Sequence, residues 1–237
     1  MISRVLGFVR DIMIAVALGA GPLADIFVVA FRLPNLFRRL FAEGAFSAAF
    51  VPLFAKRLEG DGVEGARRMA GEVFWVLLAV LGVFTLLAEI YMPAFVYALA
   101  GGFEYGSEKF NQTVYYARIT FPYLTFMSLM ALFAAMLNAT GRFALAGLAP
   151  VLLNIVLIGA LVLAWGDGRL SLDYLIWGVA LAGFLQFAAL WFGVRRAGLS
   201  LPFQWPRFSP DVRRVFVLGV PGVLAAGVIQ INLLVGT

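Results

Sequence analysis

Residues 143–165 read FALAGLAPVLLNIVLIGALVLAW and carry no charged side chain. About 20 consecutive apolar residues are enough for an α-helix to cross the hydrocarbon core of a bilayer. Four other stretches are similarly apolar, at 73–100, 119–138, 174–194 and 215–237. The repeated pattern predicts an all-α polytopic membrane protein.

Two further apolar segments, 2–19 and 24–55, open the chain but are interrupted by charges. The second is too long for one straight crossing, and Pro34 predicts a kink within it while Gly44 loosens its second half. We therefore expect seven segments, the seventh running to Thr237.

The composition also indicates a membrane protein, and it argues against catalytic and metal-binding functions. Hydrophobic residues make up 63% of the chain and charged residues 13%, against about 25% charged in soluble domains. The chain has no Cys and no His, and so lacks thiolate ligands, the commonest general base and the commonest metal ligand. We expect no enzyme activity and no cofactor. Nucleic acid is not an expected partner, because the basic residues are divided between short loops and apolar helices.

The charges of the loops predict the orientation of the bundle. The loops 20–23, 101–112 and 166–173 hold only two basic residues, Lys109 and Arg169. The other loops, 56–68, 139–142 and 195–214, hold ten basic residues: Lys56, Arg57, Arg67, Arg68, Arg142, Arg195, Arg196, Arg207, Arg213 and Arg214. Positive charge concentrates in cytoplasmic loops. We expect a multi-pass protein of the bacterial plasma (inner) membrane with a cytoplasmic N-terminus, and no cleavable signal peptide, since Arg4, Arg10 and Asp11 interrupt the first apolar run.

Charged residues also lie inside the predicted helices, where each Arg at mid-bilayer costs roughly 2.5–3.5 kcal/mol. The arginines outnumber the acids, so ion pairs with these acids alone cannot balance them. The arginines are Arg4, Arg10, Arg32, Arg38, Arg39 and Arg118, and the acids are Asp11, Asp25 and Glu43.

Two explanations fit these charges. Internal salt bridges and side chains that reach the headgroups account for single residues, whereas the excess as a set favours a water-filled cationic cavity. Arginine suits bidentate phosphate binding, so the sequence predicts a transporter lobe for an anionic, phosphate-bearing substrate. Helical spacing puts Arg4 and Asp11 on one stripe and leaves the direction of Arg38 open. Amides within the predicted helices, such as Asn154 and Gln186, predict interhelical hydrogen bonds.

Several motifs resemble one known family. SRVLGFVRD (3–11) and GAGPLADIFVVAFRLPNLFRRLFAEGAFSAAFVP (19–52), followed by LNATGRFALAGLAPVLLNI (137–155), are similar to the MurJ/MviN family of the multidrug/oligosaccharidyl-lipid/polysaccharide (MOP) exporter superfamily. The shorter motifs ITFPYL (119–124) and WGVALAGFLQF (177–187) also match. The likeness covers nearly the whole chain, and the LPNLFRRLFAEGAFS block is its most specific part.

The resemblance implies both a fold and a site. The fold is the N-terminal six-helix lobe of a MOP-type flippase plus the start of helix 7. Residues 1–197 would be the N-terminal transmembrane lobe, 198–212 a cytoplasmic linker and 213–237 the start of transmembrane helix 7. The missing C-terminal lobe is then an expected partner, and part of the cytoplasmic end of helix 1 is lacking. The substrate-binding residues implied are Arg4, Arg10, Asp11, Asp25, Asn35 and Arg38.

The function implied is alternating-access transfer of lipid II, the undecaprenyl-pyrophosphate-linked peptidoglycan precursor, from the inner to the outer leaflet. Arg4, Arg10 and Arg38 would bind the diphosphate, while Asp11 orients them and Asp25 pairs with an arginine or gates the outer side. The polyprenyl tail stays among membrane lipids. Two alternatives remain open: a flippase for another polysaccharide-linked polyprenyl lipid, and a non-transporting membrane scaffold for cell-wall synthesis.

Overall fold

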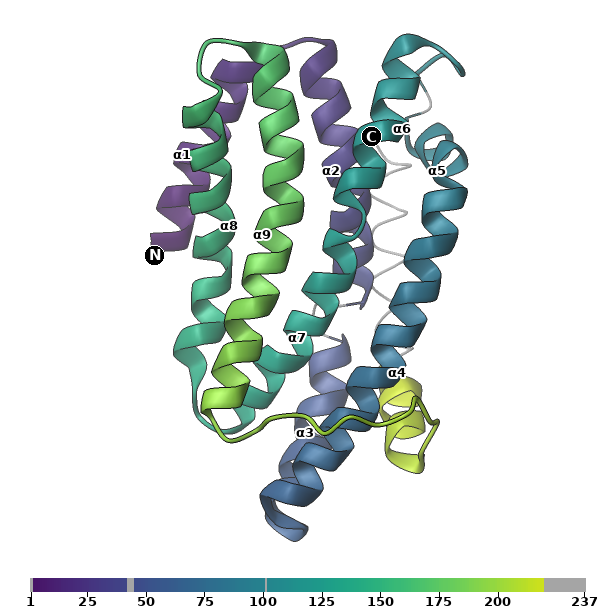
Figure 1. Ribbon diagram of the computed structural model, residues 1–237, viewed down its shortest axis with the longest axis vertical. Coiled ribbons are helices and arrows are strands. Elements are labelled where there is room, and N and C mark those ends of the chain that lie inside the picture. Colours follow the sequence, from purple (N-terminus) through teal and green to yellow (C-terminus); the bar gives the residue numbers. More distant parts are fainter. Residues whose placement is uncertain (1, 42–44, 101, 220–237) are drawn as a thin grey trace. The chain divides into compact units, whose positions relative to one another are not determined.

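The computed structural model describes residues 2–41, 45–100 and 102–219, and within these ranges the secondary structure is helical, without strands (Figure 1). Side chains at 33, 36–41 and 45 lie outside the description. The elements are α1 (Ile2–Leu18), α2 (Pro22–Phe41), α3 (Ala45–Gly60), α4 (Gly62–Ile90), α5 (Met92–Leu99), α6 (Glu108–Thr120), α7 (Tyr123–Ala139), α8 (Phe143–Leu163) and α9 (Gly168–Arg196). Residues 210–219 are also helical.

Four spans among the described residues are long and apolar enough to cross a membrane: Gly62–Ile90, Glu108–Ala139, Phe143–Leu163 and Gly168–Arg196. They correspond to four of the five strongest segments expected from the sequence. The fifth, 215–237, falls mostly outside the described residues. The fold is therefore the expected all-α, multi-pass architecture.

The predicted loop 56–68 is wrong, because it is a tight helical hairpin. The helix α3 continues to Gly60 and α4 begins at Gly62. Ion pairs at helical spacing, Arg57 to Asp61 and Arg67 to Glu64, support the two helix ends. Gly62 has a φ of +69°, a left-handed conformation that glycine adopts without steric cost. Hydrophilic residues thus extend the helices out of the apolar region instead of ending them.

At two prolines, Pro34 and Pro93, α6 supplies the hydrogen-bond donor that the proline removes. A proline has no N–H, so the carbonyl four residues before it loses its helical hydrogen bond. For Pro34 that carbonyl is on Ala30, and it accepts a hydrogen bond from the Thr120 hydroxyl at 2.7 Å. Neighbouring helices commonly satisfy such carbonyls in membrane proteins. The hydroxyl of α6 therefore lets α2 continue through Pro34 inside the fold.

The predicted segment 73–100, unlike α2 at Pro34, is divided into two helices. Its helix breaks at Tyr91, and Pro93 lies in the first turn of α5. Pro93 leaves the Glu89 carbonyl without its helical donor, and the Arg118 guanidinium donates Nε–H to that oxygen at 3.1 Å. Arg118 therefore binds a proline-freed carbonyl, and its place in a cationic cavity remains a prediction.

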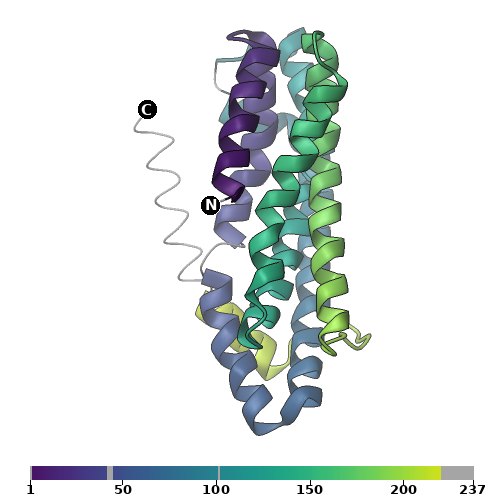
Figure 2. The same cartoon turned by 90° about the vertical axis from the view of Figure 1, so that its left-hand side faces the viewer.

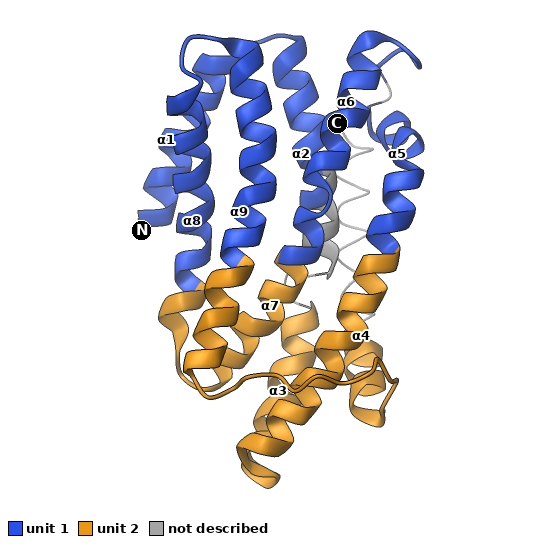
Figure 3. Cartoon of the chain, viewed as in Figure 1, with its two compact units in different colours: residues 1–35, 84–126, 147–186 blue, residues 36–83, 127–146, 187–237 orange. Residues whose placement is uncertain are grey.

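The chain forms two compact units, coloured separately in Figure 3. Unit 1 comprises residues 1–35, 84–126 and 147–186. Within it, α1 runs beside α8 (Figure 2), and α9 approaches α8 closely because Gly178 has no side chain to separate it from Leu157 and Ala160. This three-helix arrangement of α1, α8 and α9 holds the residues of the candidate site.

Unit 2 comprises residues 36–83, 127–146 and 187–237. Its connector, residues 197–209, lies along α4 and is fixed by side chains of that helix. Arg67 donates to the Ser200 carbonyl at 2.7 Å, and the Trp75 indole donates to the Pro202 carbonyl at 3.1 Å. The connector is thus anchored to α4. The predicted lobe, linker and helix 7 boundaries remain a prediction.

Candidate functional site

One face of α1 is built from Ser3, Gly7 and Arg10, which recur at helical spacing. Gly7 brings the backbone of α1 close to α8: a Cβ at this position would lie 3.7 Å from Nδ2 of Asn154. The same face places Arg10 one turn further along, against the same amide. The spacing of these residues on α1 therefore directs Arg10 toward α8.

Arg10 is held by two partners in unit 1. Its Nη1 donates to Oδ1 of Asn154 at 2.8 Å. Its Nε and Nη2 both donate to Oδ1 of Asp11, at 2.9 and 2.7 Å. The Arg10 side chain is 19% exposed, whereas that of Asp11 is 64% exposed. The guanidinium is fixed by these contacts and is still reachable from outside.

A guanidinium has five N–H donors. Three N–H···O bonds are made by Arg10, to Asp11 and Asn154, so two N–H groups remain. Arg4, two turns earlier on the same helix, is exposed. No hydrogen bond or ion pair joins Arg4 or Arg32 to another described side chain. The helix α1 thus presents one oriented cation, Arg10, and one exposed cation, Arg4, and a guanidinium suits an anionic group.

Asp25 lies near the start of α2 and pairs with Lys109 of α6, Nζ to Oδ2 at 2.6 Å. The partner observed is a lysine, where an arginine was one of the two expectations. Its side chain is 57% exposed, so water screens the pair. Asp25 and Lys109 therefore link α2 to α6 and are not joined to the Arg10 cluster by any described contact.

The remaining predicted site residues are less fully described. Asn35 is partly buried near the middle of α2. The side chains of Arg38 and Arg39, and residue Glu43, lie outside the described part of the chain. Their place in a cavity stays a prediction.

Sequence reasoning anticipated that Asn154 makes interhelical hydrogen bonds, but it did not connect Asn154 with Arg10. The two residues lie in different predicted segments, and no local spacing relates them. A usable signal was present: Asn154 is a lone polar residue in the uncharged stretch 143–165. Gln186 confirms the general expectation, since its Nε2 donates to the Ala149 carbonyl at 2.6 Å.

Charge is distributed unequally between the two units. All ten basic residues assigned to the cytoplasmic loops fall in unit 2, and Lys109 and Arg169 fall in unit 1. The orientation itself remains a prediction.

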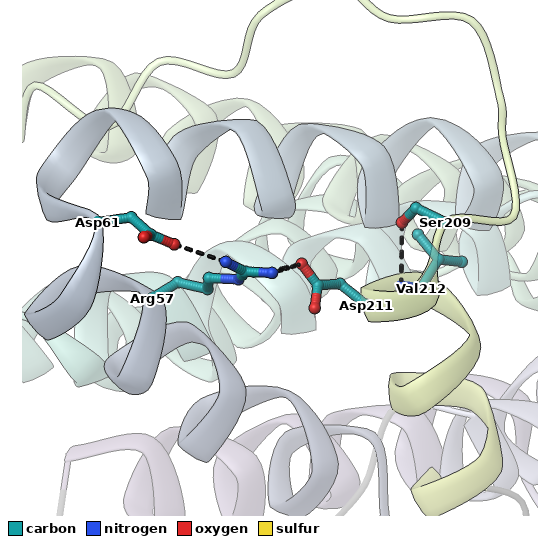
Figure 4. A network of polar contacts seen from close by, with 5 residues as sticks. All are labelled: Arg57, Asp61, Ser209, Asp211 and Val212. Carbon is teal, nitrogen blue, oxygen red and sulfur yellow. Dashed lines mark hydrogen bonds and ion pairs between the residues drawn. The ribbon is translucent and has the colours of Figure 1, made fainter.

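Within unit 2, Arg57 joins α3 to the helix that follows the connector (Figure 4). Its guanidinium contacts Asp61 at 2.6 Å and Asp211 at 2.7 Å. Hydrogen bonding to Asp61, followed by that to Asp211, raises the pKa of the Arg57 guanidinium above its ordinary value. Ser209 starts this last helix by accepting a hydrogen bond from the Val212 N–H at 3.3 Å. The ion pair between Arg57 and Asp211 fixes the end of the connector to the α3–α4 hairpin.

Comparison with known proteins gives one consistent result. A family model described as "Lipid II flippase MurJ" matches residues 14–237. A "Probable lipid II flippase MurJ" of Rhizobium tropici is 50% identical over 99% of this chain and 45% of its own length. The "Lipid II flippase MurJ" of Burkholderia cenocepacia is 37% identical over 100% of this chain and 47% of its own length. The chain therefore spans about half the length of the curated relatives it matches.

Solved structures show the same fold. A structure titled "Lipid II flippase MurJ, inward closed conformation" matches 98% of this chain and 47% of its own, with a TM-score of 0.78 and 23% identity. A structure titled "Crystal structure of MATE in complex with MaD3S" has a TM-score of 0.78 and 17% identity, covering 98% of this chain and 52% of the other. At these identities the structural likeness concerns the fold alone, which is that of one lobe of a MOP-type transporter.

Proposed function

Because this chain belongs to the lipid II flippase MurJ family, we propose that it is the N-terminal lobe of a flippase. The substrate is lipid II, which passes from the inner to the outer leaflet of the bacterial inner membrane by alternating access. The second lobe completes the transporter, and the N-terminus lies in the cytoplasm. The mechanism involves no covalent chemistry, so the chain's contribution is to bind and release an anionic headgroup.

The observation that carries the proposal is the state of Arg10. Its guanidinium is oriented by Asp11 and Asn154, keeps two free N–H groups and is partly accessible. Diphosphate oxygens are strong acceptors, and charge-assisted hydrogen bonds to Arg are about twice as strong as neutral ones. Arg10 binds the diphosphate through these N–H groups.

Other residues act around Arg10. Arg4 adds an exposed cation on α1, and Arg38 also binds the diphosphate, as the family resemblance implies. Asp11 orients Arg10 and contacts the sugar or peptide of the headgroup, with Asn35 nearby. Asp25, paired with Lys109, acts at the outer end. The polyprenyl tail remains among the membrane lipids.

The proposal is tested by complementation. The chain is completed with the C-terminal half of the Rhizobium meliloti relative, which is 51% identical to it over the shared part, and expressed in a host depleted of its own flippase. We expect Arg10→Ala to abolish growth and lipid II export at unchanged protein abundance. Arg207→Ala, which removes an exposed arginine of the connector, is the matched control and supports growth.

The alternatives predict other results. A flippase for another polyprenyl-linked saccharide leaves lipid II export unrestored even by the unaltered protein, while export of that saccharide recovers. A scaffold restores growth with either arginine replaced. Normal lipid II export by Arg10→Ala contradicts the proposed site.

A further inference from the structure

The buried amide of Asn154 lies where α8 meets the arginine-bearing face of α1. We propose that Asn154 is a positioning residue that orients Arg10 for the diphosphate without neutralising its charge. This inference rests on the proposed function, since it specifies how that site is kept competent. The inference is based on two contacts in unit 1. They join Asn154 to the backbone of α1 at Ser3 and to the side chain of Arg10.

Both ends of the Asn154 amide have a defined partner. Its Nδ2 donates to the Ser3 carbonyl at 3.0 Å, and its Oδ1 accepts from Nη1 of Arg10 at 2.8 Å. A carbonyl can only accept and a guanidinium can only donate. The amide therefore has one satisfactory orientation, which the Ser3 carbonyl fixes and which points Oδ1 at Arg10.

The position is buried, which makes the contact specific. Asn154 is 4% exposed, so water does not replace the guanidinium as its partner. Gly7 lies beside the amide on α1, and a Cβ there would be in ordinary contact with it at 3.7 and 4.0 Å. A larger side chain at Gly7 would displace the amide. Ser3, Gly7 and Arg10 on α1 thus form the binding surface for the Asn154 side chain.

A neutral acceptor is the residue type that this role requires. A buried carboxylate at position 154 would still accept from Arg10, but it would lose the donor to the Ser3 carbonyl and would cancel the charge of Arg10 in surroundings of low dielectric constant. The acid that does contact Arg10, Asp11, is 64% exposed, so it is not enclosed by protein as position 154 is. Asn154 therefore orients the guanidinium while leaving its attraction for an anion intact.

The test measures binding of undecaprenyl diphosphate to the completed chain in nanodiscs. We expect Asn154→Leu to weaken binding about tenfold, the effect of losing one hydrogen bond to a charged group. In an Arg10→Ala background the same change should have no further effect, because Asn154 acts through Arg10. Gln186→Leu removes another buried amide of unit 1 and should leave binding unchanged.

Asn154→Asp separates positioning from simple helix pairing. It keeps an acceptor facing Arg10 but loses the donor to the Ser3 carbonyl, so a purely structural tie between α1 and α8 predicts a lower melting temperature with wild-type binding. Charge cancellation predicts at least a tenfold loss while the melting temperature stays within the range of the Gln186→Leu control. Wild-type affinity in Asn154→Asp, or an equal effect of Asn154→Leu with and without Arg10, overturns the inference. Unchanged binding in Arg10→Ala alone instead overturns the proposed function.

Discussion

The closest approach of α9 to its neighbours in unit 1 gives a quantitative prediction for Gly183→Ala. A Cβ on Gly183 would lie 2.7 Å from Cδ2 and 3.4 Å from Cε2 of Tyr123, whereas carbon atoms pack at about 3.5–4.0 Å. Tyr123 is fully buried and packs against Phe31, so its ring cannot move aside freely. Overpacking of this kind costs about 1–3 kcal/mol.

Alanine also favours the helix by up to about 1 kcal/mol relative to glycine, so we expect a net loss of about 1–2 kcal/mol. For a chain of this size that corresponds to a melting temperature lower by about 2–8 °C. The measurement is a thermal unfolding curve of the purified protein in detergent. Gly159→Ala on α8 is the control, because a Cβ there meets no atom within 4 Å. If Gly183→Ala melts at or above the control, the close packing of α9 on Tyr123 is refuted.

Three further predictions concern other elements. Thr120→Val removes the donor to the proline-freed carbonyl of α2 and should lower the unfolding free energy by about 0.5–2 kcal/mol; equal stability of the two proteins would argue against that role. Asp211→Asn breaks the ion pair between the last helix and α3 and should speed tryptic cleavage of the connector, whereas Asp61→Asn, which spares that ion pair, should not. Since the chain has no Cys, single cysteines at Arg142 and Arg169 report orientation: a membrane-impermeant thiol reagent added to whole cells should label only the second, and the reverse pattern would invert the topology.

The apolar runs alone predict most of the helices, but they do not predict where one helix ends and the next begins. The run 143–165 predicted α8 (Phe143–Leu163) almost to its ends, because an uncharged stretch of that length has one stable conformation in a bilayer. The segment 24–55, by contrast, corresponds to α2 and α3, which end at Phe41 and begin at Ala45. Residues 42–44 between them, where Gly44 was expected to loosen the helix, lie outside the described residues. In the segment 73–100 the helix breaks at Tyr91, which the apolar pattern did not reveal.

The α3–α4 hairpin shows a second limit of sequence reasoning. Its charged residues were expected to form a loop, yet α3 and α4 meet across Asp61 alone. Lys, Arg, Glu and Ala are good helix formers, so polarity marks where a helix leaves the membrane and not where it ends. The loop prediction treated a change of solvent as a change of backbone conformation.

At the site, the sequence identified the charged residues of the helices but could not identify their hydrogen-bond partners on other helices. Arg10 and Asp11 are adjacent in sequence, and their ion pair is present. Arg118 was counted with the cavity arginines, and its hydrogen bond to the Glu89 carbonyl, which Pro93 leaves without a helical donor, was not foreseen. Asn154 lies 144 positions from Arg10, and only the packing of α8 on α1 brings the two together.

The central claim is that Arg10 binds the diphosphate of the transported lipid. Its most direct test is the rate at which fluorescent lipid II becomes accessible outside liposomes that contain the completed chain, compared between the wild type and Arg10→Ala. Loss of the oriented charge-assisted hydrogen bonds predicts a rate at least tenfold lower for the variant. An unchanged rate, at equal amounts of folded protein in the liposomes, would contradict the claim.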